Sequence, residues 1–271
     1  MQESFMARSA GNVPRRIIPL RSIELEESLI QKVACCENLI KSIGRTVPAK
    51  QMREWIASAE GARALGALKH ELSGHMPQQS VDFGRLLRSE IRCIRRYRSW
   101  RRERQHGALS GMDIGSLNAS LTGLGGSTRS KAVSVHSVDG SVRLSMPDWK
   151  DARKRIEEIP GLLAGGSLGG GLLAAVQVLA LIYNAHAFLD GNGRLGRLIF
   201  NHCLHEAGMP EDSYIPLKTL YSMSQGGFEI RLRQVELQGK WTRLIEYHCD
   251  IISAVHQLYS RVPSFGVKDV E

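Results

Sequence analysis

The sequence predicts a mainly helical fold that carries one β-hairpin. Along most of the chain, apolar residues recur at the three- and four-residue spacing of an amphipathic helix. One stretch, residues 131–147, instead alternates apolar and polar residues around Asp139-Gly140, which is typical of a hairpin. With 271 residues, 42% of them apolar, the chain is long enough to bury a substantial core.

The first helix is predicted over residues 22–43. Ser22, followed by acidic residues, is a suitable N-cap, and Ile23, Ile30, Val33 and Ile40 lie on or near one stripe. The stretch 106–127 is rich in Gly and Ser, so we expect a loop there. Further helical patterns run over 48–60, 62–72, 81–105, 148–159, 171–186, 194–207, 215–224, 226–238 and 240–262.

The basic excess of the chain is concentrated in one segment. The net charge is +9, and nine arginines with only two glutamates lie between Arg85 and Arg104. A solvated helix face is the simplest interpretation of such a run. The alternatives are docking on an acidic partner or on nucleic acid, although aromatic residues are sparse and no DNA- or RNA-binding signature accompanies the run.

The composition also indicates a compartment. The longest apolar stretch, residues 172–183, is too short to span a membrane, which takes roughly 20 apolar residues. The N-terminal segment has no apolar core of the kind that a cleaved signal peptide needs. Five cysteines without a CxxC spacing argue against a disulfide framework. We therefore expect a cytoplasmic bacterial protein, with a secreted effector as the alternative.

One segment, HAFLDGNGRLGR at residues 186–197, concentrates reactive side chains between two apolar helical stretches. It reads as a tight turn that delivers a helix N-terminus, where exposed N–H groups attract phosphate. Gly191 and Gly193 let the chain approach a ligand closely, and the guanidinium forks of Arg194 and Arg197 suit phosphate oxygens. The pattern therefore predicts a polyphosphate site.

The same segment supplies an acid–base group and a metal ligand. Asp190 offers a hard carboxylate oxygen of the kind that holds Mg²⁺ beside nucleotide phosphates. His186 is a natural general base near neutral pH.

HAFLDGNGRLGR resembles the motif of the Fic family, HxFx(D/E)GNGRxxR, and matches it at every defined position. Ala187 stands where the family commonly has Pro, and FEIRL at 228–232 stands where Tyr-Tyr-x-x-Leu is often found near the adenine. The hairpin resembles the Fic flap, and GKWTRLIEYHCDII resembles the final helix. The resemblance covers residues 20–262. It implies a Fic-type helical bundle with an N-terminal extension over 1–20, N-terminal helices over 21–110, a core over 111–262 and a tail over 263–271.

The resemblance implies a protein adenylyltransferase that moves AMP from ATP to a Tyr, Ser or Thr hydroxyl of a target protein. His186 would take the proton from the target hydroxyl, which attacks the α-phosphate and expels pyrophosphate. Phe188 would anchor the turn in the core, and Asp190 would hold Mg²⁺ or Mn²⁺ between the α- and β-phosphates.

The remaining motif residues would form the anion site. Gly191, Asn192 and Gly193 would cradle the phosphates, with Asn192 on the α-phosphate. Arg194 would meet the β-phosphate and Arg197 the γ-phosphate. Such transfers depend on positioning and charge neutralisation more than on covalent chemistry by the protein.

Target docking is assigned by the same resemblance to the hairpin. An extended target segment would pair with it by strand addition, which uses main-chain hydrogen bonds. The flap residues concerned are Lys131, Ala132, Val133, Ser134 and Val135.

The resemblance also implies a possible homodimer, because homodimers are common in the family.

A second resemblance concerns regulation. Ser22 and Glu26 fit the inhibitory pattern Ser/Thr-x-x-x-Glu of relatives that carry an N-terminal inhibitory helix, although Glu27 stands where Gly or Asn is usual. The carboxylate of Glu26 would pair bidentately with Arg197 and occupy the γ-phosphate site. In some relatives the same glutamate supports removal of AMP, so deAMPylation is an open activity.

The alternatives fall into two classes. One is a Fic-type transferase of UMP, phosphocholine or phosphate. Gly193 argues against phosphate transfer, because the relatives that transfer phosphate usually carry Lys there and lack the final arginine. The other is a non-catalytic regulator that binds nucleotide or nucleic acid.

Overall fold

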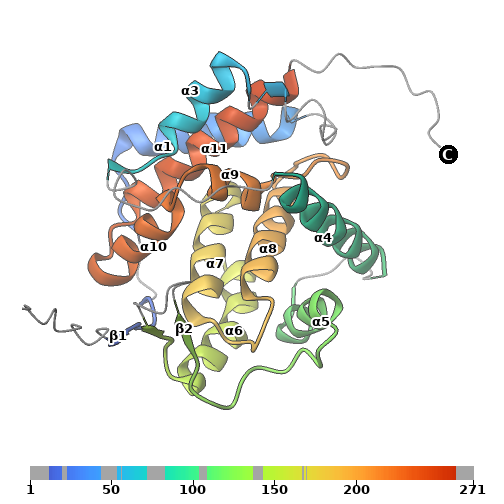
Figure 1. Ribbon diagram of the computed structural model, residues 1–271, viewed down its shortest axis with the longest axis vertical. Coiled ribbons are helices and arrows are strands. Elements are labelled where there is room, and N and C mark those ends of the chain that lie inside the picture. The colour runs from blue at the N-terminus through green and yellow to red at the C-terminus, as the bar shows by residue number, and fades with distance from the viewer. Residues whose placement is uncertain are drawn as a thin grey trace, which may run out of the picture.

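Two buried helices form the centre of the computed structural model. Helix α7 (Gly171–Ala185) and helix α8 (Asn192–Glu206) pack along one another and are joined by a short turn (Figure 1). Most residues of both helices are buried, as the continuous apolar pattern requires. The mainly helical class predicted from the sequence is confirmed. The structure describes residues 12–19, 23–43, 54–55, 57–71, 83–103, 109–136, 143–166, 168 and 170–260.

The other helices surround this pair (Figure 1). On one side lie α4 (Phe83–Glu103), α5 (Gly111–Thr122) and α6 (Trp149–Ala164). At the far end from the turn, α1 (Glu27–Ser42) and α3 (Ala59–Ala67) pack against α11 (Thr242–Ser260). Helix α9 (Leu217–Met223) contacts α4, and α10 (Gly227–Gln238) contacts α7 and α11.

The loop predicted over 106–127 is wrong, because α5 lies inside it. Ser110 and Asp113 form a capping box at the start of this helix, and Gly123 ends it with a φ of 74°. Ile114, Leu117 and Leu121, at helical spacing, are each at most 1% exposed. The prediction failed because it relied on the abundance of Gly and Ser. The helix is indicated instead by its capping residues and by one narrow apolar face.

The first helix begins later than predicted. Residues 23–26 are not helical, and α1 starts at Glu27 with Glu26 as its N-cap residue in an extended conformation. Ser22 lies outside the described residues. The buried stripe is also displaced from the predicted one: Ile30 is 46% exposed. The residues that α1 buries are Leu29, Val33, Cys36 and Ile40.

The strands form a small sheet with one more member than the sequence predicts. Strand β2 (Ser134–His136) pairs antiparallel with β3 (Arg143–Ser145), with Val135 opposite Leu144. The turn at Asp139-Gly140 lies outside the described residues. Strand β1 (Asn12–Pro14) pairs parallel with β3, so the order is β1-β3-β2. The sequence offers no pattern for β1, because three residues are too few to show a period.

Two side chains fasten the segment after β1 to the helical body. Asn184 at the end of α7 donates to the Arg16 carbonyl and accepts from the Ile18 N–H, both at 2.8 Å. Glu236 of α10 accepts from the Arg15 guanidinium at 3.0 Å and from the Arg16 N–H at 2.9 Å. The N-terminal segment therefore runs beside the α7–α8 turn. Among the described helices, none is long and apolar enough to cross a membrane.

Candidate active site

The turn between the two central helices carries the sequence motif. Helix α7 ends at His186, whose φ of 47° and ψ of 49° lie in the left-handed region. That conformation is uncommon for a residue with a side chain, and such outliers cluster at functional sites. Asn192 closes the turn: its Oδ1 accepts from the Phe188 N–H at 2.9 Å, and its Nδ2 donates to the Phe188 carbonyl at 2.7 Å.

The position of Asn192 differs from the expected contact with a phosphate. Its side chain is buried, and its amide oxygen and nitrogen are both bonded to the backbone of Phe188. In this structure Asn192 therefore shapes the turn. Phe188 lies as predicted in the core, where it is 2% exposed.

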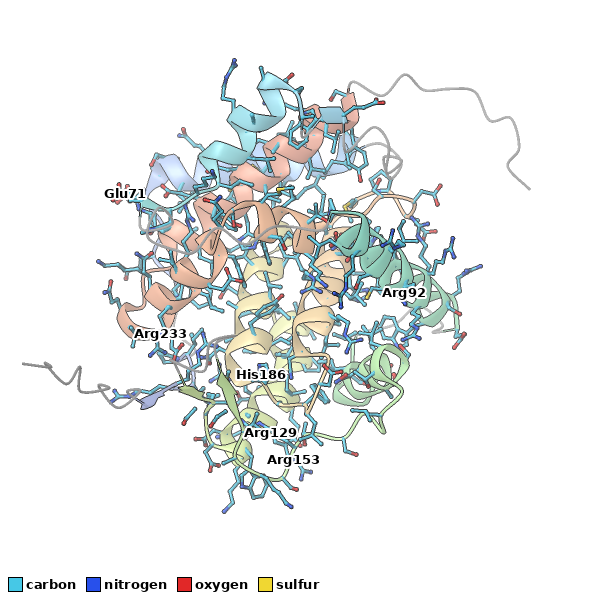
Figure 2. All side chains as sticks on the ribbon, in the orientation of Figure 1. Glu71, Arg92, Arg129, Arg153, His186 and Arg233 are labelled. Carbon is cyan, nitrogen blue, oxygen red and sulfur yellow. The ribbon has the colours of Figure 1, made fainter. Side chains whose placement is uncertain are left out.

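The imidazole of His186 is held in its neutral form. Burial, together with the guanidinium groups of Arg129 and Arg15, lowers its pKa to about 4, and Asp190 opposes this shift. Above about pH 5 the ring is therefore unprotonated, which is the state that a general base needs. This proton acceptor lies at the end of α7, where the turn begins (Figure 2).

Arg129, which the sequence reasoning missed, fixes the backbone around His186. Its guanidinium donates to the carbonyls of His186 at 2.8 Å, Lys131 at 2.9 Å and Pro147 at 2.6 Å. Its own N–H donates to the Ala187 carbonyl at 2.7 Å. Arg129 thus joins the turn to both ends of the hairpin segment, and its buried charge, which is 2% exposed, lies below His186 (Figure 2).

Asp190 and Arg194 form an ion pair at the start of α8. The Arg194 Nη2 donates to Asp190 Oδ2 at 2.7 Å, and the Gly191 N–H donates to Asp190 Oδ1 at 2.6 Å. Although desolvation opposes them, these two donors lower the pKa of Asp190. Gly191 has a φ of 85°, and a Cβ there would lie 2.6 Å from Asn118 Oδ1. Only glycine fits this close approach of α5 to the turn.

Arg197 is a buried cation without an acidic partner. It is 9% exposed, and its Nη1 donates to the Tyr183 hydroxyl at 2.7 Å. No carboxylate in the described part of the chain lies within ion-pair distance of it. The Tyr183 ring packs so closely on α8 that a Cβ at Gly196 would lie 2.9 Å from it. A buried guanidinium bonded to a neutral phenol is suited to receive an anion.

A second buried charge lies behind Arg197. Glu90 of α4 is 2% exposed and accepts from the N–H groups of Lys218 at 2.9 Å and Thr219 at 3.3 Å, and from the Thr219 hydroxyl. Desolvation raises the pKa of Glu90, while Thr219 and Arg197 act in the opposite direction. Glu90 therefore ties the arginine-rich helix to the start of α9.

The predicted flap residues lie beside this site. Lys131 and Ala132 are exposed, Val133 and Ser134 are half-buried, and the side chain of Val135 lies outside the described residues. The Val133 carbonyl accepts from the Met146 N–H at 2.9 Å. Because β1 occupies one side of β3, β2 is an outer strand of the described sheet.

Glu26 is not brought to Arg197. It is exposed at the N-cap of α1 and makes no side-chain capping bond. Helix α1 packs mainly on α11, away from the arginines of the motif (Figure 1). The expected carboxylate–guanidinium pair is therefore absent from the described residues, where the Tyr183 hydroxyl occupies that position on Arg197.

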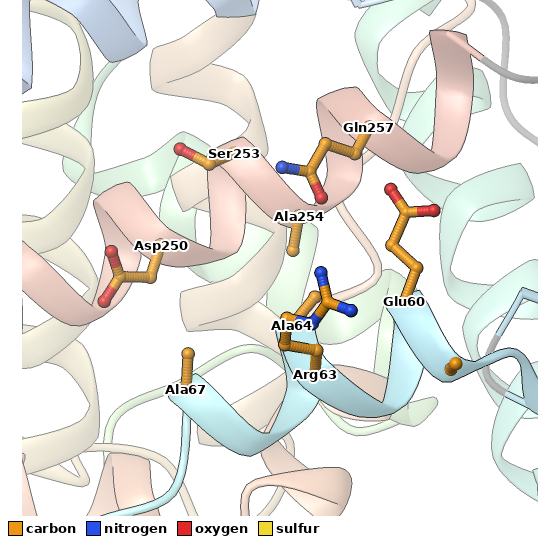
Figure 3. Close-up of a pocket in the computed structure, with 9 residues that line it drawn as sticks. Glu60, Arg63, Ala64, Ala67, Asp250, Ser253, Ala254 and Gln257 are labelled. Carbon is orange, nitrogen blue, oxygen red and sulfur yellow. The ribbon is translucent and has the colours of Figure 1, made fainter.

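A groove elsewhere on the molecule carries no comparable chemistry. It has a volume of about 570 Å³ and lies between α3 and α11, at the opposite end from the turn (Figures 1 and 3). Figure 3 shows its lining of alanines with a few polar side chains, among them Arg63, Glu60 and Asp250. Neither histidine nor cysteine lines it.

The residues that sequence reasoning missed share one property. They all lie outside the motif. Arg129, Tyr183 and Asn118 bond to it, whereas Glu90 bonds to the start of α9 and acts on Arg197 through its charge. Tyr183 could have been noticed in the sequence, because it carries a hydroxyl within an otherwise apolar helical stretch. The other three follow no spacing rule, because their partners lie on different elements.

Two of three comparisons with known proteins found similar proteins. Residues 113–204 match the family model described as Fic/DOC family. No curated protein matches the sequence. A Fic family protein from Desulfovibrio desulfuricans G20 has 18% identity and a TM-score of 0.58, with 88% of this chain and 75% of that chain covered.

Two further solved structures are similar. A Fic domain containing signaling protein from Bacteroides thetaiotaomicron VPI-5482 has 15% identity and a TM-score of 0.52, with 84% of this chain and 96% of that chain covered. Fic-1 from C. elegans has 14% identity and a TM-score of 0.52, with 86% and 71% covered. At such identities the likeness shows the fold. The chain thus has the helical Fic fold, and its motif segment lies in a Fic/DOC match.

Proposed function

We propose that this protein transfers AMP from ATP to a hydroxyl group of a target protein. One observation carries the proposal: a neutral imidazole and a buried guanidinium that forms no ion pair with the described residues lie in the same short segment, at His186 and Arg197. The first can accept a proton, and the second can bind a phosphate. The Fic/DOC match over residues 113–204 supports transferase chemistry of this general kind.

In the proposed reaction, His186 accepts the proton of the target hydroxyl. The hydroxyl oxygen forms a bond to the α-phosphorus of ATP, and the bond from that phosphorus to the bridging oxygen breaks, so pyrophosphate leaves. The position of the ring is set by the left-handed turn and by the hold of Arg129 on the His186 carbonyl. Correct placement of reacting groups supplies a large part of the rate in such transfers.

The phosphates would bind at the N-terminus of α8. Arg197 and Arg194 supply guanidinium groups, and Gly193 allows a close approach of the backbone. Asp190 suits Mg²⁺ or Mn²⁺, because its carboxylate is 63% exposed and, within the described ranges, has only Arg194 as an ionic partner. A divalent ion there would neutralise phosphate charge.

The target segment would bind along β2. This strand lies at the outer side of the described sheet, and the hairpin is tied to the His186 turn by Arg129. Strand addition would therefore place a target hydroxyl near the imidazole.

The test is transfer of label from α-³²P-ATP with Mg²⁺ to protein in a bacterial lysate. We expect labelled bands with the wild-type protein or an activated variant, and none with His186→Ala. A parallel reaction with γ-labelled ATP, labelled UTP and CDP-choline separates AMP transfer from the other Fic-type transfers. Label from α-³²P-ATP that persists in His186→Ala contradicts the proposal.

Regulation by Glu26 is a separate part of the proposal. It requires a second arrangement of residues 23–26, since Glu26 is exposed here and Arg197 is bonded to Tyr183. If Glu26 inhibits, Glu26→Gly increases labelling severalfold, whereas Glu24→Gly, at another exposed acid of the same segment, leaves it unchanged. Equal labelling by both variants and the wild type contradicts inhibition by Glu26.

A further inference from the structure

The arginine-rich helix reaches the motif through one shared carbonyl group. Arg96 Nη1 of α4 donates to the Leu121 carbonyl at 2.8 Å, and Arg194 Nη1 of the motif donates to the same oxygen at 3.0 Å. Two guanidinium groups on one oxygen are close neighbours. Leu121 lies in the last turn of α5, where unpaired carbonyls favour cations.

Lys218 of α9 is a fourth cation beside Arg96, Arg194 and Arg197. Asn201 of α8 joins the start of this helix to the motif, because its Nδ2 donates to the carbonyls of Arg197 at 2.9 Å and Ile215 at 3.2 Å. Lys218 follows three residues after Ile215, is half-buried, and its backbone N–H is held by Glu90. Burial lowers the pKa of Lys218, and the guanidinium groups of Arg197 and Arg194 lower it further. Glu90 opposes this shift. Asn201 and Glu90 thus hold the start of α9, with Lys218 on it, beside the motif.

The acids nearby do not balance these four cations. The two carboxylates beside them, Glu90 and Asp190, carry at most two negative charges against the four positive ones. Glu90 accepts from two N–H groups and a hydroxyl of α9, and Asp190 from Arg194 and the Gly191 N–H. No ion pair of Arg96, Arg197 or Lys218 occurs in the part of the chain that the structure describes. Like charges gathered in this way repel one another unless an anion binds between them.

Two other arginines of the run have partners away from the motif. Arg98 donates to the Asp212 carbonyl at 2.7 Å, and Arg101 lies 3.6 Å from Glu206 and 3.7 Å from Glu211. Arg92 is exposed, and Figure 2 labels it on α4. The run is therefore divided, and Arg96 is the member that meets the motif, at the Leu121 carbonyl. A small group of cations favours a compact polyphosphate over a nucleic-acid strand, which needs a row of cations.

We propose that Lys218 and Arg96 extend the phosphate site of the motif and bind the outer phosphates of the nucleoside triphosphate and of the departing pyrophosphate. This inference rests on the proposed function for the identity of the nucleotide. When the bond to the α-phosphorus breaks, the bridging oxygen takes the electron pair, and negative charge increases on the pyrophosphate. A mobile ammonium and a guanidinium beside Arg194 stabilise that charge.

The test measures binding, so it does not depend on turnover. Titration calorimetry with Mg²⁺ compares a non-hydrolysable ATP analogue, AMP and inorganic tripolyphosphate. We expect Lys218→Met to weaken the ATP analogue and tripolyphosphate about tenfold, the loss of one charge-assisted contact, and to change AMP binding less than twofold. Lys218→Arg retains the charge and restores most of the affinity. Arg96→Gln weakens both polyphosphates about threefold.

Matched controls and the thermal midpoint of each variant complete the design. Lys240→Met and Arg95→Gln remove exposed cations elsewhere, on the loop before α11 and on α4, and leave tripolyphosphate binding unchanged. Tripolyphosphate binding that is equal in Lys218→Met and the wild type overturns the inference, as does a wild type that binds no polyphosphate. A single-stranded oligonucleotide that binds through Arg96 when tripolyphosphate does not bind overturns it in favour of nucleic acid. Lys218-dependent tripolyphosphate binding without AMP transfer leaves this site standing and removes the proposed function instead.

Discussion

Tyr183 holds the guanidinium of Arg197 without neutralising it. Desolvation raises the pKa of the phenol, so the hydroxyl keeps its proton and the guanidinium keeps its full charge. The same hydroxyl lies 3.2 Å from the Gly193 carbonyl, to which it donates. The ring also lies edge-on to Phe228, with 5.0 Å between centroids. One side chain therefore sets the position of the last arginine and of the turn at the start of α8.

Tyr183→Phe tests this positioning role. The ring and its packing remain, but Arg197 loses its acceptor and becomes more mobile. We expect the KM for ATP to rise threefold to tenfold with kcat changed less than threefold, because a hydrogen bond to a charged group is worth about 1.5–3 kcal/mol at most. Tyr221→Phe, which removes a buried hydroxyl bonded to His248, serves as the control. A fall in stability with no change in KM contradicts the positioning role and leaves Tyr183 with a packing role only.

At this scale the sequence predicts what is contiguous. His186, Asp190, Arg194 and Arg197 fall within one segment whose spacing already implies a helix N-terminus. Asn192 shows the limit of such prediction. An amide in a glycine turn has two uses, binding a ligand or bonding the backbone, and only the positions of the Phe188 N–H and carbonyl decide between them.

At the scale of elements, the sequence predicts the long apolar helices well but does not predict the N-terminal strand. Helices with a broad apolar face, such as α7, α8 and α11, end within two residues of their predicted bounds. Helix α5 and strand β1 were missed for physical reasons. The first is marked mainly by its caps, and the second exists because β3 offers an edge and Asn184 holds the segment that follows.

Asn184→Ala is expected to release this N-terminal segment. It removes the two hydrogen bonds to Arg16 and Ile18, and the free energy of unfolding falls by about 2 kcal/mol. Hydrogen exchange of the Ile18 amide increases at least tenfold, whereas amides in the middle of α7 keep their protection. Asn38→Ala, at an exposed site on α1, changes stability by less than about 0.5 kcal/mol. Unchanged exchange at Ile18 in Asn184→Ala contradicts the role given to these bonds.

For the whole molecule, three histidines with strongly lowered pKa values couple folding to pH. Burial is the main cause that lowers the pKa of His186, His205 and His248 to about 4 each. In the unfolded chain a histidine has a pKa near 6.5. Between about pH 6.5 and pH 4 the unfolded state therefore binds more protons than the folded state, so the free energy of unfolding falls as the pH falls. Glu90, whose pKa is raised, acts in the opposite sense over part of that range.

The expected size of this effect is about 2 kcal/mol for each histidine between pH 7 and pH 5, and about 5 kcal/mol for the three together. Urea unfolding at a series of pH values measures it. His205→Gln keeps a polar side chain near the Met209 carbonyl, which now lies 3.2 Å from the ring, and reduces the pH dependence by about one third. The neutral state of His186, which suits it to the proposed role of base, and the acid sensitivity of the fold then have one cause, the burial of uncharged imidazole rings. Stability that stays constant from pH 7 to pH 5 contradicts both the burial of these rings and the base assigned to the reaction.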